Sequence, residues 1–281
     1  MESGDPLVTA EWLKEHISAP DVRVVDATWF PPFLNPEKTG RQAWAEGHIP
    51  GAVYFDIDAI KAGGTDLPHM LPDPVMFSSR ARKLGLGDGN RIIVYDQFNF
   101  FASARVWWML RVMGQRDVKV LDGGLKAWTD AGGETEDLPP VAVERHFTAR
   151  VRSDLLKDSD QMLAASANSS HNIIDSRSAE RFSGEAPEPR EGLPSGHIPG
   201  SICLPSGELR TEDGRMKSAE ELGKLFPNPL AHTLATCGSG VSAAVTALAL
   251  ARLGNWDVAV YDGSWAEWAS DASRPVATGT A

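Results

Sequence analysis

The amino-acid sequence predicts an α/β fold built from two similar domains in tandem, each a mostly parallel sheet flanked by helices. The chain has 281 residues, about twice the usual size of one domain, so each half can bury its own core. A four-residue motif occurs once in each half. Short β-branched runs alternate with helix-like segments in both halves, which is typical of βαβ units and parallel sheets.

The repeat is centred on His48-Ile49-Pro50-Gly51, which recurs as His197-Ile198-Pro199-Gly200. In each half an aspartate, Asp26 or Asp175, precedes the motif by 22 positions. Because both histidines recur with their motif, we interpret them as structural residues of a turn. We expect an N-terminal domain over residues 1–133, a linker over 134–143 that contains Pro and acidic residues, and a C-terminal domain over 144–281.

The apolar runs predict the central strands of both sheets. These runs cover 22–26, 91–95 and 118–121 in the first half, and 172–175, 233–236 and 257–261 in the second. The clearest helices span Arg105 to Met113 and Ala243 to Leu253. Ligands of such sheets bind at the carboxyl ends of the strands, where loops lead into helices.

The composition argues against two classes of partner. Asp and Glu outnumber Lys and Arg by 38 to 27, giving a net charge of −11, and no run of basic residues predicts a nucleic-acid interface. No run approaches the roughly 18 to 20 apolar residues of a membrane-spanning helix. The segment Met1 to Asp5 lacks the basic and apolar regions of a signal peptide, so we expect a cytoplasmic protein without a membrane partner.

The chain has two cysteines, Cys203 and Cys237, too few for a disulfide scaffold and without the spacing of a zinc site. Cys203 lies in an apolar, strand-like run and is expected in the core. Cys237-Gly238-Ser239-Gly240-Val241-Ser242 stands between a buried strand and an Ala-rich helix. Such a loop can turn its N–H groups toward the sulfur, so we expect a lowered thiol pKa and a reactive thiolate.

This loop, the paired His-Ile-Pro-Gly motifs and the paired Asp-Gly segments ending in Trp128 and Trp268 resemble the mercaptopyruvate and thiosulfate sulfurtransferases, which have tandem rhodanese-like domains. The resemblance covers nearly the whole chain. It implies a catalytic C-terminal domain and an inactive N-terminal copy. Consistent with this, Tyr95-Asp96 occupies the place of Thr236-Cys237, and a longer loop through Phe98, Phe100 and Phe101 is expected to replace the glycine loop.

The resemblance implies that sulfur moves from 3-mercaptopyruvate through a persulfide on Cys237, with release of pyruvate. Arg181 and Arg190 match the two arginines that bind the donor carboxylate in this family, and arginine suits that task because its planar fork meets a carboxylate with two hydrogen bonds. The loop residues expected to contact the donor are Gly238, Gly240, Val241 and Ser242. Because the loop carries no basic residue, it favours mercaptopyruvate over the compact dianion thiosulfate.

The resemblance also implies a Ser-His-Asp set made of Ser239, His69 and Asp58, which would place the active site between the domains. Expected acceptors are cyanide, small thiols or a thioredoxin-like protein, and neither a metal nor an organic cofactor is implied. Two alternatives stay open at this point, a thiosulfate:cyanide sulfurtransferase and a non-enzymatic persulfide carrier. A tyrosine-phosphatase-like activity is excluded, since Ala243 and Ala244 stand where that chemistry needs a phosphate-binding arginine.

Overall fold

The structure, a computed structural model, describes residues 4–98, 100–168 and 170–280. Met1, Glu2 and Ser3, part of the N-terminal segment considered above, lie outside the described residues. Two five-stranded sheets have the strand orders β1-β5-β4-β2-β3 and β6-β10-β9-β7-β8. The first sheet contains β1 (Leu7–Val8), β2 (Val22–Asp26), β3 (Val53–Tyr54), β4 (Arg91–Tyr95) and β5 (Val118–Leu121). The second contains β6 (Leu156–Lys157), β7 (Asn172–Asp175), β8 (Ser201–Cys203), β9 (Thr233–Thr236) and β10 (Ala259–Tyr261).

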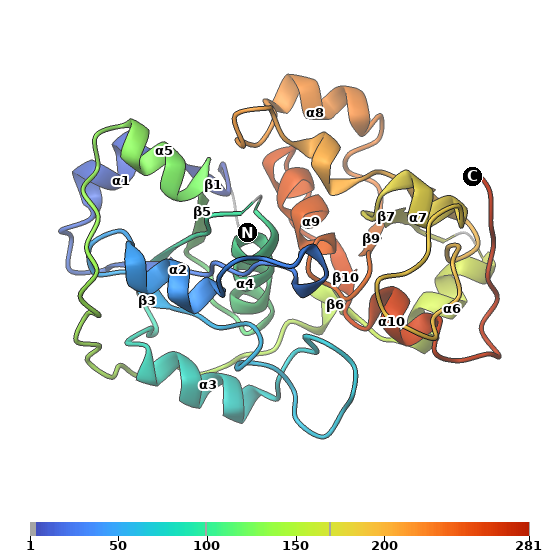
Figure 1. Cartoon of the computed structure of the whole chain (residues 1–281), viewed down its shortest axis with the longest axis horizontal. Coiled ribbons are helices and arrows are strands. Elements are labelled where there is room, and N and C mark those ends of the chain that lie inside the picture. The colour runs from blue at the N-terminus through green and yellow to red at the C-terminus, as the bar shows by residue number, and fades with distance from the viewer. Residues whose placement is uncertain (1–3, 99, 169, 281) are drawn as a thin grey trace.

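Helices surround each sheet, as the sequence predicts for a fold of this class (Figure 1). Those of the first half are α1 (Ala10–His16), α2 (Gly40–Glu46), α3 (Pro74–Lys83), α4 (Phe101–Val112) and α5 (Gly124–Asp130), with the 3₁₀ turn η1 (Pro32–Leu34). Those of the second half are α6 (Ser159–Asn168), α7 (Ala179–Ser183), α8 (Ala219–Leu225), α9 (Ala243–Arg252) and α10 (Ser264–Trp268), with η2 (Ser153–Leu155) and η3 (Ser206–Leu209). No helix in the described ranges is long and apolar enough to cross a membrane.

The strand register confirms that the two halves repeat one another. All strand pairs of both sheets are parallel, and Asp26 pairs with Tyr95 just as Asp175 pairs with Thr236. The central strands β4 and β9 are buried, because helices cover both faces of a parallel sheet. Asp96 and Cys237 therefore leave their sheets at the same point of the fold.

One expectation about the first half is wrong. The loop after β4 is not longer than the Cys237 loop. Helix α4 begins at Phe101, five residues after Asp96, whereas α9 begins at Ala243, six residues after Cys237. Phe100, which precedes α4, has a positive φ of 61°, and such left-handed backbone lets the chain turn into the helix quickly.

One hydrophobic cluster joins the two halves, and each half also has a smaller cluster of its own. Helix α4 packs against α9 at the centre of the molecule (Figure 1), and a single cluster of buried residues takes members from both halves. Trp107 and Trp108 on α4 are fully buried in this cluster. The relative placement of the halves is therefore set by close packing, which positions any site that lies between them.

The histidines of the repeated motif occupy equivalent structural positions. His48 and His197 are buried, and their Nδ1 atoms lie 2.8 Å from the carbonyl oxygen of Trp44 and 2.9 Å from that of Phe182. Each backbone also forms an antiparallel bridge, His48 with Glu136 and His197 with Ala277. Both contacts support the interpretation of these histidines as turn-fixing residues.

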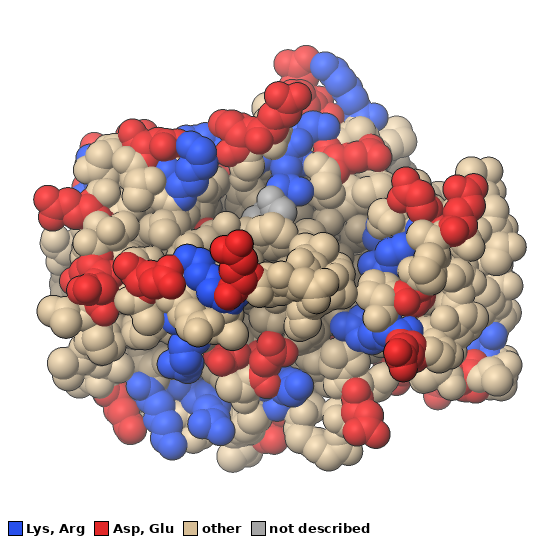
Figure 2. Space-filling view, in the orientation of Figure 1, with Lys and Arg blue, Asp and Glu red and all other residues tan. Residues whose placement is uncertain are grey.

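The chain between the halves remains attached to the first half. Beyond the bridge at Glu136, the N–H of Asp88 donates to the carbonyl of His146, and the N–H of Arg150 donates to the carbonyl of Met113, at 2.8 and 2.9 Å. The domain boundaries given above stay a prediction. On the face shown in Figure 2, acidic and basic side chains are interspersed around a largely uncharged centre, so the net charge is not gathered there in one acidic patch.

Candidate functional site

Cys237 follows the buried strand β9 directly and is only 2% exposed. Its N–H donates to Ser264 Oγ at 3.2 Å, and its carbonyl accepts the N–H of Trp265 at 3.0 Å. The loop returns toward β10 through Gly240, whose φ is +73°. A Cβ at Gly240 would lie 2.6 Å from the carbonyl oxygen of Asp262, so only glycine fits there.

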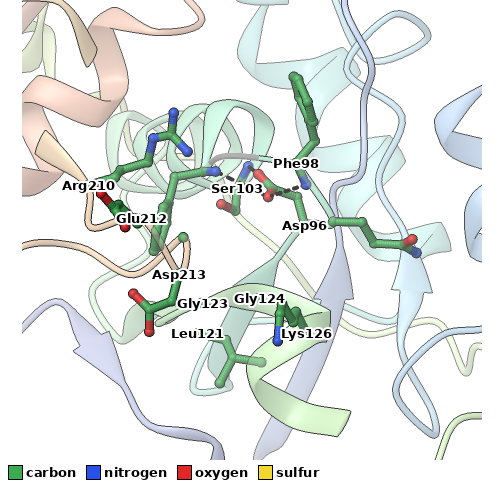
Figure 3. A pocket seen from close by; sticks show the side chains of 13 residues that line it. Asp96, Phe98, Ser103, Leu121, Gly123, Gly124, Lys126, Arg210, Glu212 and Asp213 are labelled. Atoms are coloured by element: carbon green, nitrogen blue, oxygen red, sulfur yellow. Dashed lines mark hydrogen bonds between the residues drawn. The ribbon is translucent and has the colours of Figure 1, made fainter. Parts of the chain in front are cut away.

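The equivalent loop of the first half already holds an anion. The Asp96 carboxylate accepts the N–H groups of Phe98, Phe100 and Ser103 at 3.0, 3.3 and 2.8 Å (Figure 3). In the Cys237 loop, no hydrogen bond within the described part of the chain uses the N–H groups of residues 238–242. These donors belong to the loop that follows Cys237, and in the other copy of the fold the N–H groups at the equivalent position bind a negative charge.

Two arginines border this loop. A Cβ placed on Gly238 would lie 3.1 Å from a guanidinium nitrogen of Arg181 and 3.7 Å from one of Arg190. Burial lowers the pKa of Arg190, while the charge of a Cys237 thiolate opposes that shift, so Arg190 and the sulfur are close enough to interact. The structure thus brings both predicted arginines to the Cys237 loop.

The two arginines differ in their partners. Arg181 donates from Nε and Nη2 to the carboxylate of Glu188, whose side chain is buried and also accepts from Arg177. Arg190 has no hydrogen bond or ion pair with any described residue. Arg181 is therefore held in place and partly neutralised, whereas Arg190 keeps its donors available for a ligand.

His69 comes from the first half and is 5% exposed, with a φ of +59°. Burial, reinforced by the charges of Arg105 and Arg190, lowers the pKa of His69 to about 3. Its Nδ1 lies 3.3 Å from Asp58 Oδ1, and the other Asp58 oxygen accepts the indole N–H of Trp29 at 2.8 Å. Because His69 is neutral near pH 7, its contact with Asp58 is not an attraction between two full charges.

Of the predicted Ser-His-Asp set, Asp58 and His69 are in contact. Ser239 is buried in the Cys237 loop, but no hydrogen bond joins it to His69 in the residues that the structure describes. Val241 is buried and Ser242 caps α9 by position, without a side-chain hydrogen bond to the helix. These two residues shape the end of the loop through their backbone.

A buried arginine that sequence reasoning missed joins these parts. Arg105, on α4, donates to Asp262 Oδ1 at 2.6 Å, to the carbonyl of Gly240 at 3.2 Å and to the carbonyl of His69. The other Asp262 oxygen accepts the N–H of Leu71 at 2.6 Å. One guanidinium and one carboxylate therefore fix the His69 segment of the first half against the Cys237 loop of the second.

The second cysteine is placed differently from the prediction. Cys203 lies on the edge strand β8 and is partly exposed rather than in the core, because an edge strand is covered on fewer sides. Burial and the charge of Asp175 raise the pKa of the Cys203 thiol to about 11. Cys203 is therefore a thiol, and a poor nucleophile, at neutral pH. Among the described residues no group of three His, Cys, Asp or Glu side chains could hold a metal ion.

Comparison with known proteins agrees with this architecture. The family model of the rhodanese-like domain matches residues 9–131 and again residues 158–271. The chain belongs to the rhodanese family and contains two copies of its domain.

Individual relatives are similar over nearly their whole length. The 3-mercaptopyruvate sulfurtransferase of Escherichia coli is 40% identical over 96% of this chain and 96% of its own, and the thiosulfate sulfurtransferase of Gallus gallus is 39% identical over 94% and 93%. The crystal structure of the Escherichia coli 3-mercaptopyruvate enzyme SseA superposes with a TM-score of 0.85 at 38% identity, covering 93% of this chain and 99% of that one.

Replacing Arg105 with Met should destabilise the protein strongly, because it leaves the buried Asp262 carboxylate without its cation. Breaking a buried ion pair in this way costs about 3 to 5 kcal/mol of unfolding free energy. Arg91→Met is the matched control, since the Arg91–Asp117 pair is 35% and 48% exposed and such pairs contribute about 1 kcal/mol or less. Urea unfolding measures both variants. Equal losses of unfolding free energy in the two variants would mean that the buried Arg105–Asp262 pair stabilises the protein no more than the exposed pair does.

His69 should make the protein sensitive to acid. Between pH 6.5 and about 3 the unfolded chain binds a proton at His69 that the native state does not, so stability falls as the pH falls, by at most about 1.4 kcal/mol per pH unit. His69→Gln should reduce the stability difference between pH 7 and pH 5 in urea unfolding, and His146→Gln, at an exposed site, controls for the loss of a histidine. If His69→Gln showed the same stability difference between pH 7 and pH 5 as wild type, His69 could not be a neutral, buried residue of the native state.

Proposed function

We propose that this protein is a 3-mercaptopyruvate sulfurtransferase that carries sulfur as a persulfide on Cys237. The observation that carries the proposal is the pair of equivalent segments. The loop after β4 and the first turn of α4 bind the Asp96 carboxylate through three N–H groups, while no described hydrogen bond uses the N–H groups that follow Cys237 after β9. A thiolate or a terminal persulfide sulfur is an anion that fits this position. The names of the relatives support the same reaction class.

The donor is assigned from the two arginines. Arg190, with its donors available, and Arg181, held by Glu188, both border Gly238. A carboxylate next to the reacting sulfur would accept hydrogen bonds from Arg190 and be attracted by Arg181. The carboxylate of 3-mercaptopyruvate, separated from its sulfur by two carbon atoms, suits such an arrangement.

In the first half-reaction the Cys237 thiolate attacks the sulfur of the donor. The new S–S bond forms as the carbon–sulfur bond breaks, and its electron pair leaves as the enolate of pyruvate. The enolate takes up a proton and departs as pyruvate, while Cys237 keeps the persulfide. The step needs no external oxidant or reductant, because the thiolate supplies the electron pair of the S–S bond and the enolate carries away the pair of the broken C–S bond.

His69, Asp58 and Ser239 are assigned supporting roles. A neutral imidazole can donate one hydrogen bond and accept another, so His69 can polarise the donor carbonyl and pass a proton toward the enolate without being charged at rest. Asp58 Oδ1 lies 3.3 Å from His69 Nδ1 without a hydrogen bond among the described residues, and the Trp29 ring packs edge-on against the imidazole, so we assign both a role in positioning it. Ser239 adds a hydroxyl to the same side of the loop once a donor occupies it.

In the second half-reaction a nucleophile takes the outer sulfur and restores the thiolate. Cyanide, small thiols and a thioredoxin-like protein are the proposed acceptors, and the cytoplasm is the proposed compartment. Cys203 is not assigned to this step, since its raised pKa keeps it protonated.

Thiosulfate:cyanide sulfur transfer is the second candidate. The argument from a neutral loop is weakened by the two guanidinium groups next to Gly238, because they place positive charge where a dianion could use it. The similarity to a relative named as a thiosulfate sulfurtransferase favours the same possibility. The two donors therefore have to be compared directly.

Arg190→Ala should lower kcat/KM for mercaptopyruvate by about 10 to 150-fold, the cost of losing a charged hydrogen bond to the donor. The loss for thiosulfate should be much smaller, and wild type should prefer mercaptopyruvate. Steady-state rates of pyruvate and thiocyanate formation measure the two reactions. Arg116→Ala, at an exposed position before β5, is the control. Equal losses for both donors would mean that Arg190 supplies only positive potential.

A further inference from the structure

A cavity lies beside Asp96, at the point of the first half that is equivalent to Cys237 in the second. Its volume is about 240 Å³, which suits a ligand smaller than the drug-sized molecules that fill pockets of roughly 300 to 1,000 Å³. Residues of both halves line it, among them Asp96, Phe98, Ser103, Lys126, Arg210 and Glu212 (Figure 3). Arg210, Glu212 and Asp213 face Asp96 and Ser103 from the opposite side.

The same kind of contact between the halves occurs beside this cavity and beside the Cys237 loop. After β3 the chain crosses to the second half, where the N–H of Leu71 donates to Asp262 at 2.6 Å. After β8 the chain crosses to the first half, where the N–H of Met216 donates to Asp122 at 2.8 Å. The repeat has thus kept an interdomain contact here, although Asp96 cannot carry a persulfide.

The groups that face the cavity carry both signs of charge. Burial raises the pKa of Asp96 to about 6, so a positive group beside this carboxylate would recover part of the lost solvation. Burial lowers the pKa of Arg210, and the charge of Asp96 opposes that shift. Ser103, 1% exposed, lies beside the Asp96 carboxylate, and its N–H and hydroxyl both oppose the rise in the pKa of Asp96.

These charges disfavour a ligand of a single sign. An anion such as phosphate would meet Asp96 and Glu212, and a simple cation would meet Arg210. Lys126 and Asp213, at the rim, are exposed and paired with Asp130 and Arg215. A ligand that carries both charges a few bonds apart avoids both conflicts. Phe98 and Phe100 supply apolar surface for the remainder of such a molecule.

We propose that this cavity binds a small zwitterionic α-amino acid, with its ammonium group toward Asp96 and its carboxylate toward Arg210. The Asp96 oxygens, which already accept three N–H groups, have lone pairs left for an ammonium donor. The site carries no sulfur chemistry, so it adds a binding function to the first half that is separate from the reaction at Cys237.

Isothermal titration with L-serine tests the proposal, because serine has the size of a small amino acid and no thiol that could react with Cys237. We expect saturable binding to wild type. Lactate, which lacks the ammonium group, and ethanolamine, which lacks the carboxylate, should bind at least about tenfold more weakly. Equal binding of lactate or ethanolamine, or no saturable binding of serine at millimolar concentration, would overturn the proposal.

Variants locate the binding. Asp96→Asn and Arg210→Gln should each weaken serine binding by about 10 to 150-fold, while Arg190→Ala, at the other site, should leave it unchanged. Asn offers the N–H groups only one acceptor oxygen, so Asp96→Asn can lose its fold, which circular dichroism detects. In that case serine binding by Arg210→Gln tests the proposal by itself. Binding that is lost in Arg190→Ala and kept in Arg210→Gln would place serine at the donor site and overturn the proposal. The heat of binding is measured without any sulfur donor, so this result is independent of the proposed reaction.

Discussion

The buried ion pair between Arg105 and Asp262 is the interaction on which the site depends. Both side chains are almost fully buried, at 0% and 3% exposure, and two charges removed from water are tolerated when they are paired and most of their hydrogen bonds are made. Arg105 Nε is the one atom of this guanidinium without a partner among the described residues. The guanidinium also bonds the carbonyls of Gly240 and His69 and lies 4.5 Å from the centre of the Trp108 ring. Since each partner belongs to a different segment, the pair fixes the two halves, the Cys237 loop and the His69 segment together.

The two halves show how one fold can use the same loop position in two ways. In the first half the Asp96 carboxylate takes the N–H donors, so the loop is internally satisfied. In the second half Cys237 stands at this point, and no described hydrogen bond uses the N–H groups of the loop that follows it. The chemical difference thus follows from one side chain at the end of the central strand, and the surrounding sheet and interdomain contacts are common to both.

Local patterns predicted most of the fold. The β-branched runs gave β2, β4, β5, β7 and β9 with their observed ends, because the strand signal is contained within a few residues. The repeat located Asp96 and Cys237 at equivalent points, and the glycine loop identified Cys237 itself. The strand expected over 257–261 begins two residues later than predicted, at Ala259, and element ends are the least certain part of such predictions.

What sequence patterns missed depends on contacts between distant segments. The sequence pattern places Arg105 only at the start of a predicted helix, although a charged residue in an otherwise apolar helix is a signal of a buried partner. Glu188, between the two arginines, neutralises Arg181 and leaves Arg190 as the residue with available donors, which spacing alone could not distinguish. The neutrality of His69 likewise follows from its burial between the halves.

The most direct test of the account is the intact mass of the protein after one exposure to 3-mercaptopyruvate without an acceptor. Wild type and Cys203→Ser should each gain the mass of one sulfur atom, Cys237→Ser should gain nothing, and addition of cyanide should return the original masses. A gain of one sulfur atom by Cys237→Ser, or no gain by Cys203→Ser, would contradict the assignment of Cys237 as the sulfur carrier.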